Sequence, residues 1–164
     1  TEHRMMYILI GIKKYLESNQ IDKANFMLEQ YITKVKRFSA TINTNNPYFD
    51  FVLSSKIHEF MYDGIFLKNT LFICENPIYD TNEFCDLIIY LLDSFKDNLN
   101  SKTGLSLGIH QENNFIIMEI IGDLKEYKIT DTLYKKIEYF TTDYSLKNVA
   151  SIYTLKLVID IDIE

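Results

Sequence analysis

The first forty residues contain two long helical patterns that only three polar residues separate, and this spacing limits how the chain can fold. Between residues 2 and 17 a broad apolar stripe recurs at helical spacing, formed by Met5, Met6, Ile8, Leu9, Ile10, Ile12 and Leu16. The break at residues 18–20 is followed by Asp22, which can cap a second helix that runs to about Phe38. Because the connection is so short, the two helices must pack antiparallel as a hairpin.

An isolated hairpin cannot bury an apolar stripe this broad. A stripe that extends around more than one side of a helix is typical of a helix inside a bundle. We therefore expect residues 1–40 to form a helical hairpin that dimerises into a four-helix bundle. Residues 41–46, with the sequence TINTNN, lack periodicity and are predicted to form a hinge.

The remaining chain alternates helical and strand patterns. Pro47 suits the first turn of a helix capped by Asn46, and Gly64 suits its C-terminal end. The later patterns predict a strand at 65–74, a helix at 82–98, two paired strands at 105–110 and 115–121, a short helix at 130–140, a helix or strand at 144–152, and a half-exposed strand at 154–163. This order predicts an α+β domain over residues 47–164, in which helices cover one face of a mixed sheet.

Composition and charge exclude several classes of protein. Of 164 residues 47% are hydrophobic, which is enough for a core, and the net charge of −6 argues against nucleic-acid binding. No apolar run reaches the roughly 18 residues of a membrane span, so we expect no membrane contact for this segment. The sequence does not decide whether a membrane anchor or a longer first helix precedes residue 1. Cys74 and Cys85 lack a CxxC spacing, and no secretory signal precedes them. They are predicted to be reduced core residues of a cytoplasmic protein.

Two stretches resemble a known group of signalling proteins. The string HRMMYIL at 3–9, followed by the hairpin, and the string NPYFDFVLSSKI at 46–57 resemble the cytoplasmic part of peptide-quorum-type sensor histidine kinases and the sporulation initiation phosphotransferase B family. The kinases carry H-D-x-x-N, a hairpin, and N-P-x-x-D-x-x-L-x-x-K-I before a GHKL ATPase domain, whereas the phosphotransferases have lost ATP binding. The resemblance implies a dimeric hairpin at 1–40 and a degenerate histidine-kinase-ATPase-like α/β sandwich at 47–164.

The chain departs from the kinases where they bind nucleotide. Their N-L-L-D-N-A string, whose asparagine helps to hold Mg²⁺, is YLLDSF at 90–95, so that Tyr90 and Ser94 stand where the asparagines belong. The kinases also carry a Gly-rich lid over the nucleotide and an Asp-x-Gly segment, whose glycines let the backbone approach phosphate groups. In this chain the segment at the position of the lid, residues 144–149, has no glycine, and residues 121–124 are at best a remnant of the Asp-x-Gly segment. We therefore expect this chain to bind no ATP and no other cofactor.

His3 is then the residue to which the resemblance assigns chemistry. A neutral imidazole is a nucleophile near pH 7, so His3 can accept and donate a phosphoryl group. The leading hypothesis is a phosphorelay histidine phosphotransferase that exchanges phosphoryl groups with response-regulator receiver domains, which would supply Mg²⁺. Arg4 replaces an acidic neighbour and could steady the phosphoryl charge, and Tyr7 replaces an asparagine.

Two alternatives remain open. His3 is equally an ordinary polar residue at a helix start, in which case the chain is a catalytically inactive signalling pseudokinase that acts as a dimeric protein-interaction module. An active sensor kinase is a third possibility, which the missing glycines and asparagines disfavour. His58 and His110 are interpreted as solvated surface residues without zinc-ligand spacing, and Asp160, Asp162 and Glu164 as solvated edge charges.

Overall fold

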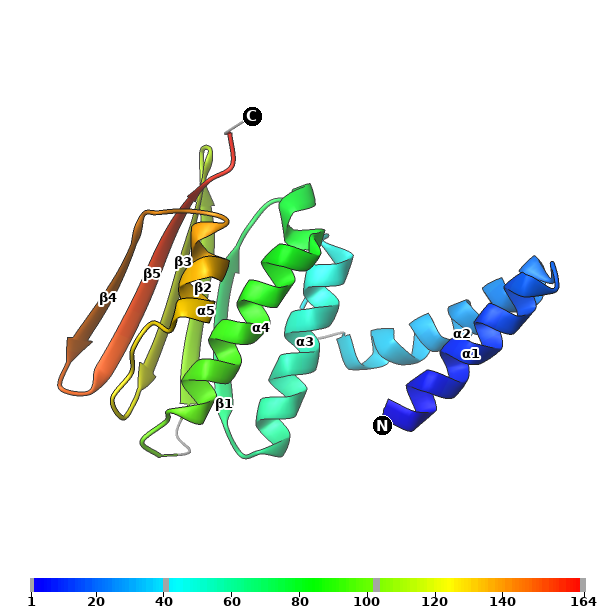
Figure 1. Ribbon diagram of the computed structural model, residues 1–164, viewed down its shortest axis with the longest axis horizontal. Helices are drawn as coiled ribbons and strands as arrows, with labels where there is room; N and C mark the ends of the chain where they lie inside the picture. The colour runs from blue at the N-terminus through cyan, green and yellow to red at the C-terminus, as the bar shows by residue number, and fades with distance from the viewer. Residues whose placement is uncertain (1, 40–41, 102–103, 163–164) are drawn as a thin grey trace. The chain divides into compact units, whose positions relative to one another are not determined.

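The computed structural model shows a mixed α+β chain whose described residues form five α-helices and one five-stranded sheet (Figure 1). It describes the backbone of residues 2–39, 42–101 and 104–162, and the side chains of residues 5–32, 42–101 and 104–162. The chain divides into two compact units, Thr1–Ala40 and Thr41–Glu164.

The first unit is a helical hairpin, formed by α1 (Glu2–Glu17) and α2 (Ile21–Ser39) packed on each other. The turn between them uses Asn19, whose φ of 57° lies in the left-handed region that asparagine tolerates. The prediction that Asp22 caps α2 is wrong, because the helix already begins at Ile21 and Asp22 lies in its first turn. The Gln20 carbonyl accepts the first helical hydrogen bond, from the Ala24 N–H.

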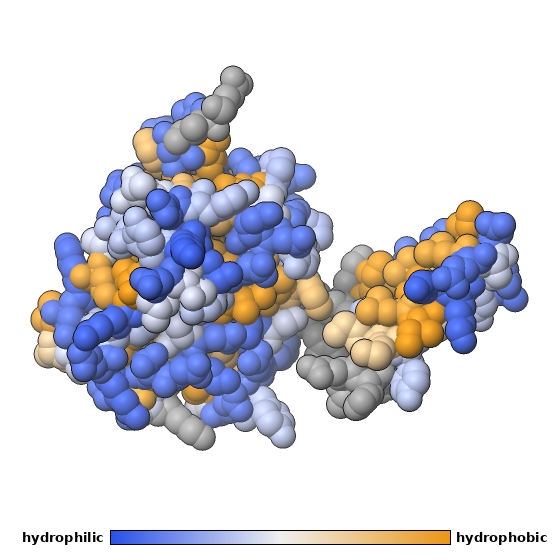
Figure 2. Space-filling model, viewed as in Figure 1, coloured by the Kyte–Doolittle hydropathy of each residue, from blue (hydrophilic) through white to orange (hydrophobic). Residues whose placement is uncertain are grey.

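This hairpin leaves most of its apolar surface exposed. Only Ile12 and Ala24 are buried among the side chains described in the two helices. The exposed apolar side chains are Met5, Met6, Tyr7, Leu9, Ile10, Leu16, Ile21, Phe26, Leu28 and Ile32. Figure 2 shows apolar residues gathered on the visible face of the hairpin. The broad stripe read from the sequence is therefore present, and a single copy of the hairpin does not cover it.

The second unit is a sheet with helices on one face (Figure 1). The elements in chain order are α3 (Pro47–Tyr62), β1 (Phe66–Phe72), the 3-10 helix η1 (Pro77–Asp80), α4 (Asn82–Asp97), β2 (Gly104–Glu112), β3 (Phe115–Asp123), α5 (Asp131–Glu138), β4 (Tyr144–Val149) and β5 (Ile152–Asp160). The strand order is β1-β2-β3-β5-β4, with β1 parallel to β2 and the other pairs antiparallel. The predicted mixed sheet with helices on one face is confirmed.

Strict alternation in the strands builds the core. The inward side chains of the central strands are fully or almost fully buried, namely Leu105, Leu107, Ile109, Ile116, Met118, Ile120, Leu155, Leu157 and Ile159. They pack against the apolar faces of α3, α4 and α5, which form one continuous cluster with them. The outward residues on the same strands are half-buried or exposed, and none of the described helices of the second unit covers that face of the sheet (Figure 1).

Several local predictions need correction. The segment 144–152, left open between helix and strand, contains strand β4, which pairs with β5. β4 pairs with residues 152–157 of β5, so Asp160 lies beyond the part of β5 that β4 covers, and Asp162 follows the end of the strand and is exposed; Glu164 lies outside the described residues. Asp160 accepts a hydrogen bond from the Asp162 N–H. Cys85 is buried as expected, whereas Cys74 is exposed.

The ends of α3 are fixed by two local devices. Gly64, with φ of +75°, ends the helix in the left-handed conformation, as the sequence predicts. Asn46 occupies the N-cap position, but its side chain does not cap the helix. Instead the Asp80 carboxylate of η1, an element that the sequence did not predict, accepts hydrogen bonds from the N–H groups of Tyr48 and Phe49 at 3.0 and 3.2 Å. Within the described residues, no helix is both long and apolar enough to span a membrane.

Candidate functional site

The hairpin carries the residues to which the sequence assigned phosphotransfer. His3 and Arg4 lie in the first turns of α1, and their side chains are outside the described part of the structure. Tyr7, one turn further along α1, is 74% exposed. The placement of the three residues on one helix follows from their spacing.

The second candidate site is the groove between α4 and α5, which contains Tyr90 and Ser94 of the string YLLDSF at 90–95. Two cavities of about 510 and 230 Å³ adjoin along this groove and share Asp86 and Lys136 as lining residues. The larger cavity is lined by Asp86, Ile89, Tyr90, Asp93, Ser94, Asp97 and Lys136. Three carboxylates against one ammonium make this wall acidic, which is unfavourable for a polyphosphate.

The two positions that hold asparagine in kinases are engaged in contacts with the chain itself. The Lys136 ammonium of α5 lies over the Tyr90 ring, 5.5 Å from its centroid. The Ser94 hydroxyl shares a hydrogen bond of 2.8 Å with the Tyr127 hydroxyl and also donates to the Leu91 carbonyl. Neither Tyr90 nor Ser94 supplies the amide oxygen that Mg²⁺ coordination would require.

Tyr127 fills the space beside these positions. Its side chain is only 6% exposed, and its ring packs on Phe95 and Tyr153 at centroid distances of 4.7 and 6.1 Å. Burial raises the pKa of its hydroxyl, with a smaller opposing effect from the bond to Ser94. Sequence reasoning missed Tyr127 and Lys136. The one available signal was an isolated aromatic residue inside the charged run 125–128.

Asp123, at the end of β3, belongs to the remnant of the Asp-x-Gly segment. Its carboxylate accepts hydrogen bonds from Ser151 Oγ and Asn100 Nδ2, each at 2.7 Å. These two bonds lower the pKa of Asp123. They tie the end of β3 to the β4–β5 turn and to the segment after α4, so this carboxylate is engaged in holding loops together.

The matching motif at 46–57 has a structural role. Asn46 is completely buried, and its Nδ2 donates to the Thr44 and Cys74 carbonyls while its Oδ1 accepts from the Asn76 N–H. Asp50 accepts from both the backbone N–H and the hydroxyl of Thr44, at 2.9 and 2.6 Å. Together these bonds fasten Thr44 and Asn46, which belong to the predicted hinge at 41–46, onto α3 and onto the segment after β1.

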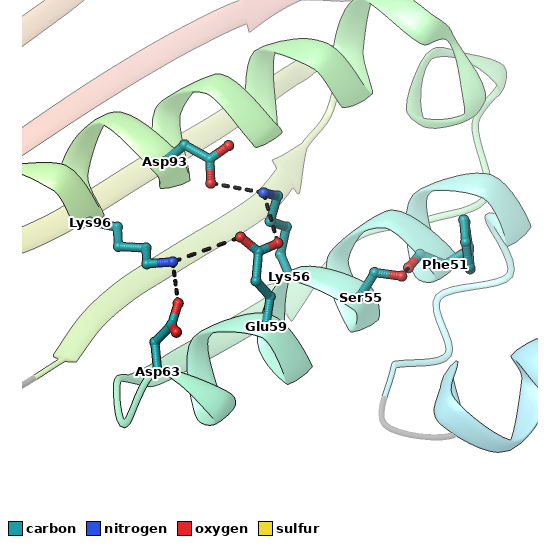
Figure 3. Close-up of polar contacts among 7 residues, drawn as sticks. All are labelled: Phe51, Ser55, Lys56, Glu59, Asp63, Asp93 and Lys96. Carbon is teal, nitrogen blue, oxygen red and sulfur yellow. Dashed lines mark hydrogen bonds and ion pairs between the residues drawn. The ribbon is translucent and has the colours of Figure 1, made fainter. Parts of the chain in front are cut away.

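Lys56 of the same motif contacts Asp93 of the string YLLDSF at 90–95 (Figure 3). Lys56 Nζ lies 2.8 Å from Asp93 Oδ1 on α4 and 3.1 Å from Glu59 Oε2 on its own helix. Burial lowers the pKa of the Lys56 ammonium, but the bonds to Asp93 and Glu59 outweigh it, and the pKa lies above its usual value. Lys96 of α4 bridges back to Asp63 and, at 3.8 Å, to Glu59, so these charges join the two helices.

His58 and His110 lie on α3 and β2. His58 is exposed on α3, and His110 lies within β2, 3.5 Å from the Glu112 carboxylate. Within the described ranges, no group of three histidine, cysteine or acidic side chains is placed to hold a metal ion.

Comparison with known proteins establishes the fold. No protein-family model matches this sequence, and no curated protein is significantly similar to it. Among solved structures it is similar to the Acinetobacter baumannii histidine kinase AdeS, with a TM-score of 0.50, 12% identity and 98% of each chain covered. It is also similar to the Erythrobacter litoralis EL346 blue-light activated histidine kinase, with a TM-score of 0.58 and 9% identity; 98% of this chain and 59% of that chain are covered.

The chain therefore has a histidine-kinase-like fold, the class that its sheet order, its helices and its N-terminal hairpin define. At identities this low the similarity extends to the fold alone, and function has to be argued from the residues.

Proposed function

We propose that this chain is a histidine phosphotransferase of a phosphorelay, in which His3 receives a phosphoryl group from a receiver-domain aspartate and passes it to another. The observation that carries the proposal is what the residues of the motif at 46–57 and of the string at 90–95 contact in the structure. The residues that still match, Asn46, Asp50, Lys56 and Asp93, hold the second unit together. The positions that would hold Mg²⁺ and nucleotide, Tyr90 and Ser94, contact Lys136 and Tyr127 instead.

This pattern supports loss of the ATP site with retention of the fold. A chain that keeps the hairpin and its histidine but lacks a nucleotide cradle must obtain phosphate from another protein. Phosphoryl transfer requires of this chain only a correctly positioned imidazole. A neutral imidazole nitrogen of His3 attacks the phosphorus of an aspartyl phosphate; the N–P bond forms as the acyl O–P bond breaks, and the aspartate leaves as a carboxylate. The receiver domain supplies the acidic pocket and Mg²⁺, while the hairpin supplies position.

The proposal includes a homodimer. Because a single hairpin leaves Met5, Leu9, Ile10 and Phe26 exposed, two hairpins packed as a four-helix bundle would cover these side chains and hold α1 rigid. An exposed imidazole at the start of such a helix would be accessible to a receiver domain docked near Arg4 and Tyr7.

The experiment uses phosphohistidine mapping. The protein is incubated with phosphorylated receiver domains encoded in the same genome, and the phosphorylated residue is located by mass spectrometry. We expect label on the wild type, none on His3→Gln, and full labelling of the matched controls His58→Gln and His110→Gln. Label on either control histidine in place of His3 would contradict the assignment.

The second candidate function is a signalling pseudokinase that acts through binding alone. Arg4 and Tyr7 favour it, because they stand where the family has an acidic residue and an asparagine next to its histidine. If none of the receiver domains labels the wild type although one of them binds it, this second function replaces the first.

A further inference from the structure

The edge strand β1 has a sequence that reads nearly the same in both directions. Its seven residues are Phe66-Leu67-Lys68-Asn69-Thr70-Leu71-Phe72, centred on Asn69. β1 is the first strand of the sheet, and among the described residues only β2 pairs with it, so its outer side has no strand partner. An unpaired edge presents backbone N–H and C=O groups to any strand that matches it.

A second copy of the same strand matches this edge in an antiparallel register. With Asn69 opposite Asn69 of the other copy, Phe66 meets Phe72, Leu67 meets Leu71, and Lys68 meets Thr70. Every apolar residue then faces one of its own kind, and aromatic and aliphatic cross-strand pairs of this type stabilise sheets. A two-fold axis through the centre of the strand generates this arrangement, which makes the contact self-complementary and closed.

The charges of the edge fit the same register. Lys68 is the only charged residue of β1, and in this pairing it faces the neutral Thr70 rather than its own copy. The register therefore places no like charge directly opposite another.

The burial of β1 agrees with a missing neighbour. Phe66 and Phe72 are 67% and 72% exposed and lie on the face of the sheet opposite to Leu67, and a strand paired at this edge would place a phenylalanine beside each of them. By contrast β4, the other edge strand, has the sequence Tyr-Ser-Leu-Lys-Asn-Val, which pairs unlike residues when reversed. Self-complementarity thus belongs to one edge of the sheet.

We propose that the β1 edge is a second, weaker self-association surface, through which two copies join their sheets antiparallel about Asn69. The contact uses seven residues a side, which is small for an interface, so it forms at high local concentration and links hairpin dimers to one another. It is independent of His3 and of phosphotransfer.

The register is tested by cross-linking the full-length chain with Cys74 changed to Ser. In Asn69→Cys the two introduced thiols face each other across the axis, at a Cα separation of about 4.5–5.5 Å that a disulfide can bridge. In the control Phe72→Cys they lie six residues out of register, about 20 Å apart. We expect a covalent dimer from Asn69→Cys and none from Phe72→Cys, although residue 72 is highly exposed. Failure of Asn69→Cys to cross-link, or equal cross-linking by the control, would overturn the proposal.

A charge pair tests the same register without a covalent bond. Thr70→Lys places a lysine opposite Lys68 twice in each pair of copies, whereas Thr70→Glu places a carboxylate there. Sedimentation equilibrium, in the wild-type and Leu9→Asp backgrounds, should show the self-association constant about 2- to 30-fold weaker for Thr70→Lys and stronger for Thr70→Glu. Circular dichroism should show equal melting of the two variants. Equal association of the two folded variants would contradict the register.

Discussion

Replacement of the buried Asn46 by alanine is the sharpest test of the role assigned to the matching motif. Asn46 is 0% exposed and makes three contacts with backbone groups outside its own helix, at 3.1 Å to Thr44 O, 3.3 Å to Cys74 O and 3.1 Å from the Asn76 N–H. Alanine leaves these groups without that partner. A buried polar group left unsatisfied costs about 1–3 kcal/mol. Because Cys74 and Thr44 are partly reachable by water, we expect a total loss of about 2–3 kcal/mol.

The assay is urea unfolding of the full chain followed by tyrosine fluorescence. A loss of about 2–3 kcal/mol lowers the unfolding midpoint by about 1–2 M when the denaturant slope is about 1.5 kcal/mol/M. Asn43→Ala is the matched control, since Asn43 is exposed in the same segment, and its midpoint should stay within about 0.3 M of the wild type. If Asn46→Ala unfolds at the wild-type midpoint, the motif does not hold the second unit together and the reasoning fails.

Three further predictions concern charge, protonation and assembly. Lys56→Met and Asp93→Asn should each lower the free energy of unfolding by about 1–2 kcal/mol. A double-mutant cycle should give a coupling energy of about 1 kcal/mol, because Lys56 is largely buried and Asp93 is partly exposed. Additive effects of the two substitutions would exclude a direct ion pair. Burial raises the pKa of the Cys85 thiol to about 12 from 9.0, so at high pH the folded state keeps a proton that the unfolded state loses. This group should leave the free energy of unfolding unchanged below pH 9 and lower it between pH 9 and 12. The fall should be less steep in Cys85→Ala, and equal slopes for the two proteins would refute the assignment. At low micromolar concentration the wild type should have twice the 19.4 kDa chain mass, and Leu9→Asp should have the monomer mass. The control Tyr139→Asp, an equally polar change at an exposed residue of the second unit, should remain dimeric. A monomeric wild type would contradict the four-helix bundle.

The sequence predicted the elements whose information is local. Period-2 alternation located β2, β3 and β5, and Gly64 marked the end of α3, because the residue types themselves dictate those conformations. The hairpin followed from apolar spacing and a three-residue break. η1 was missed because four residues that begin with Pro77 read as a turn, and β4 stayed open because six half-exposed residues carry little periodic signal.

The contacts of the candidate site could not be read from the sequence, since they join distant residues. Lys56 and Asp93 are 37 residues apart, and Ser94 and Tyr127 are 33 apart. The departures at Tyr90 and Ser94 were visible in the sequence, but what they contact depends on how α5 and the segment after β3 pack against α4. Asp80 likewise reaches the start of α3 only through the fold.

The central claim is that phosphate reaches His3 from another protein and not from ATP. The direct measurement compares two donors on the same preparation: Mg²⁺-ATP labelled at the γ-phosphate, and a receiver domain carrying labelled aspartyl phosphate. We predict acid-labile, base-stable label from the receiver only, and no thermal stabilisation by Mg²⁺-ATP. Label from ATP, or a melting temperature raised by several degrees with Mg²⁺-ATP, would contradict this account.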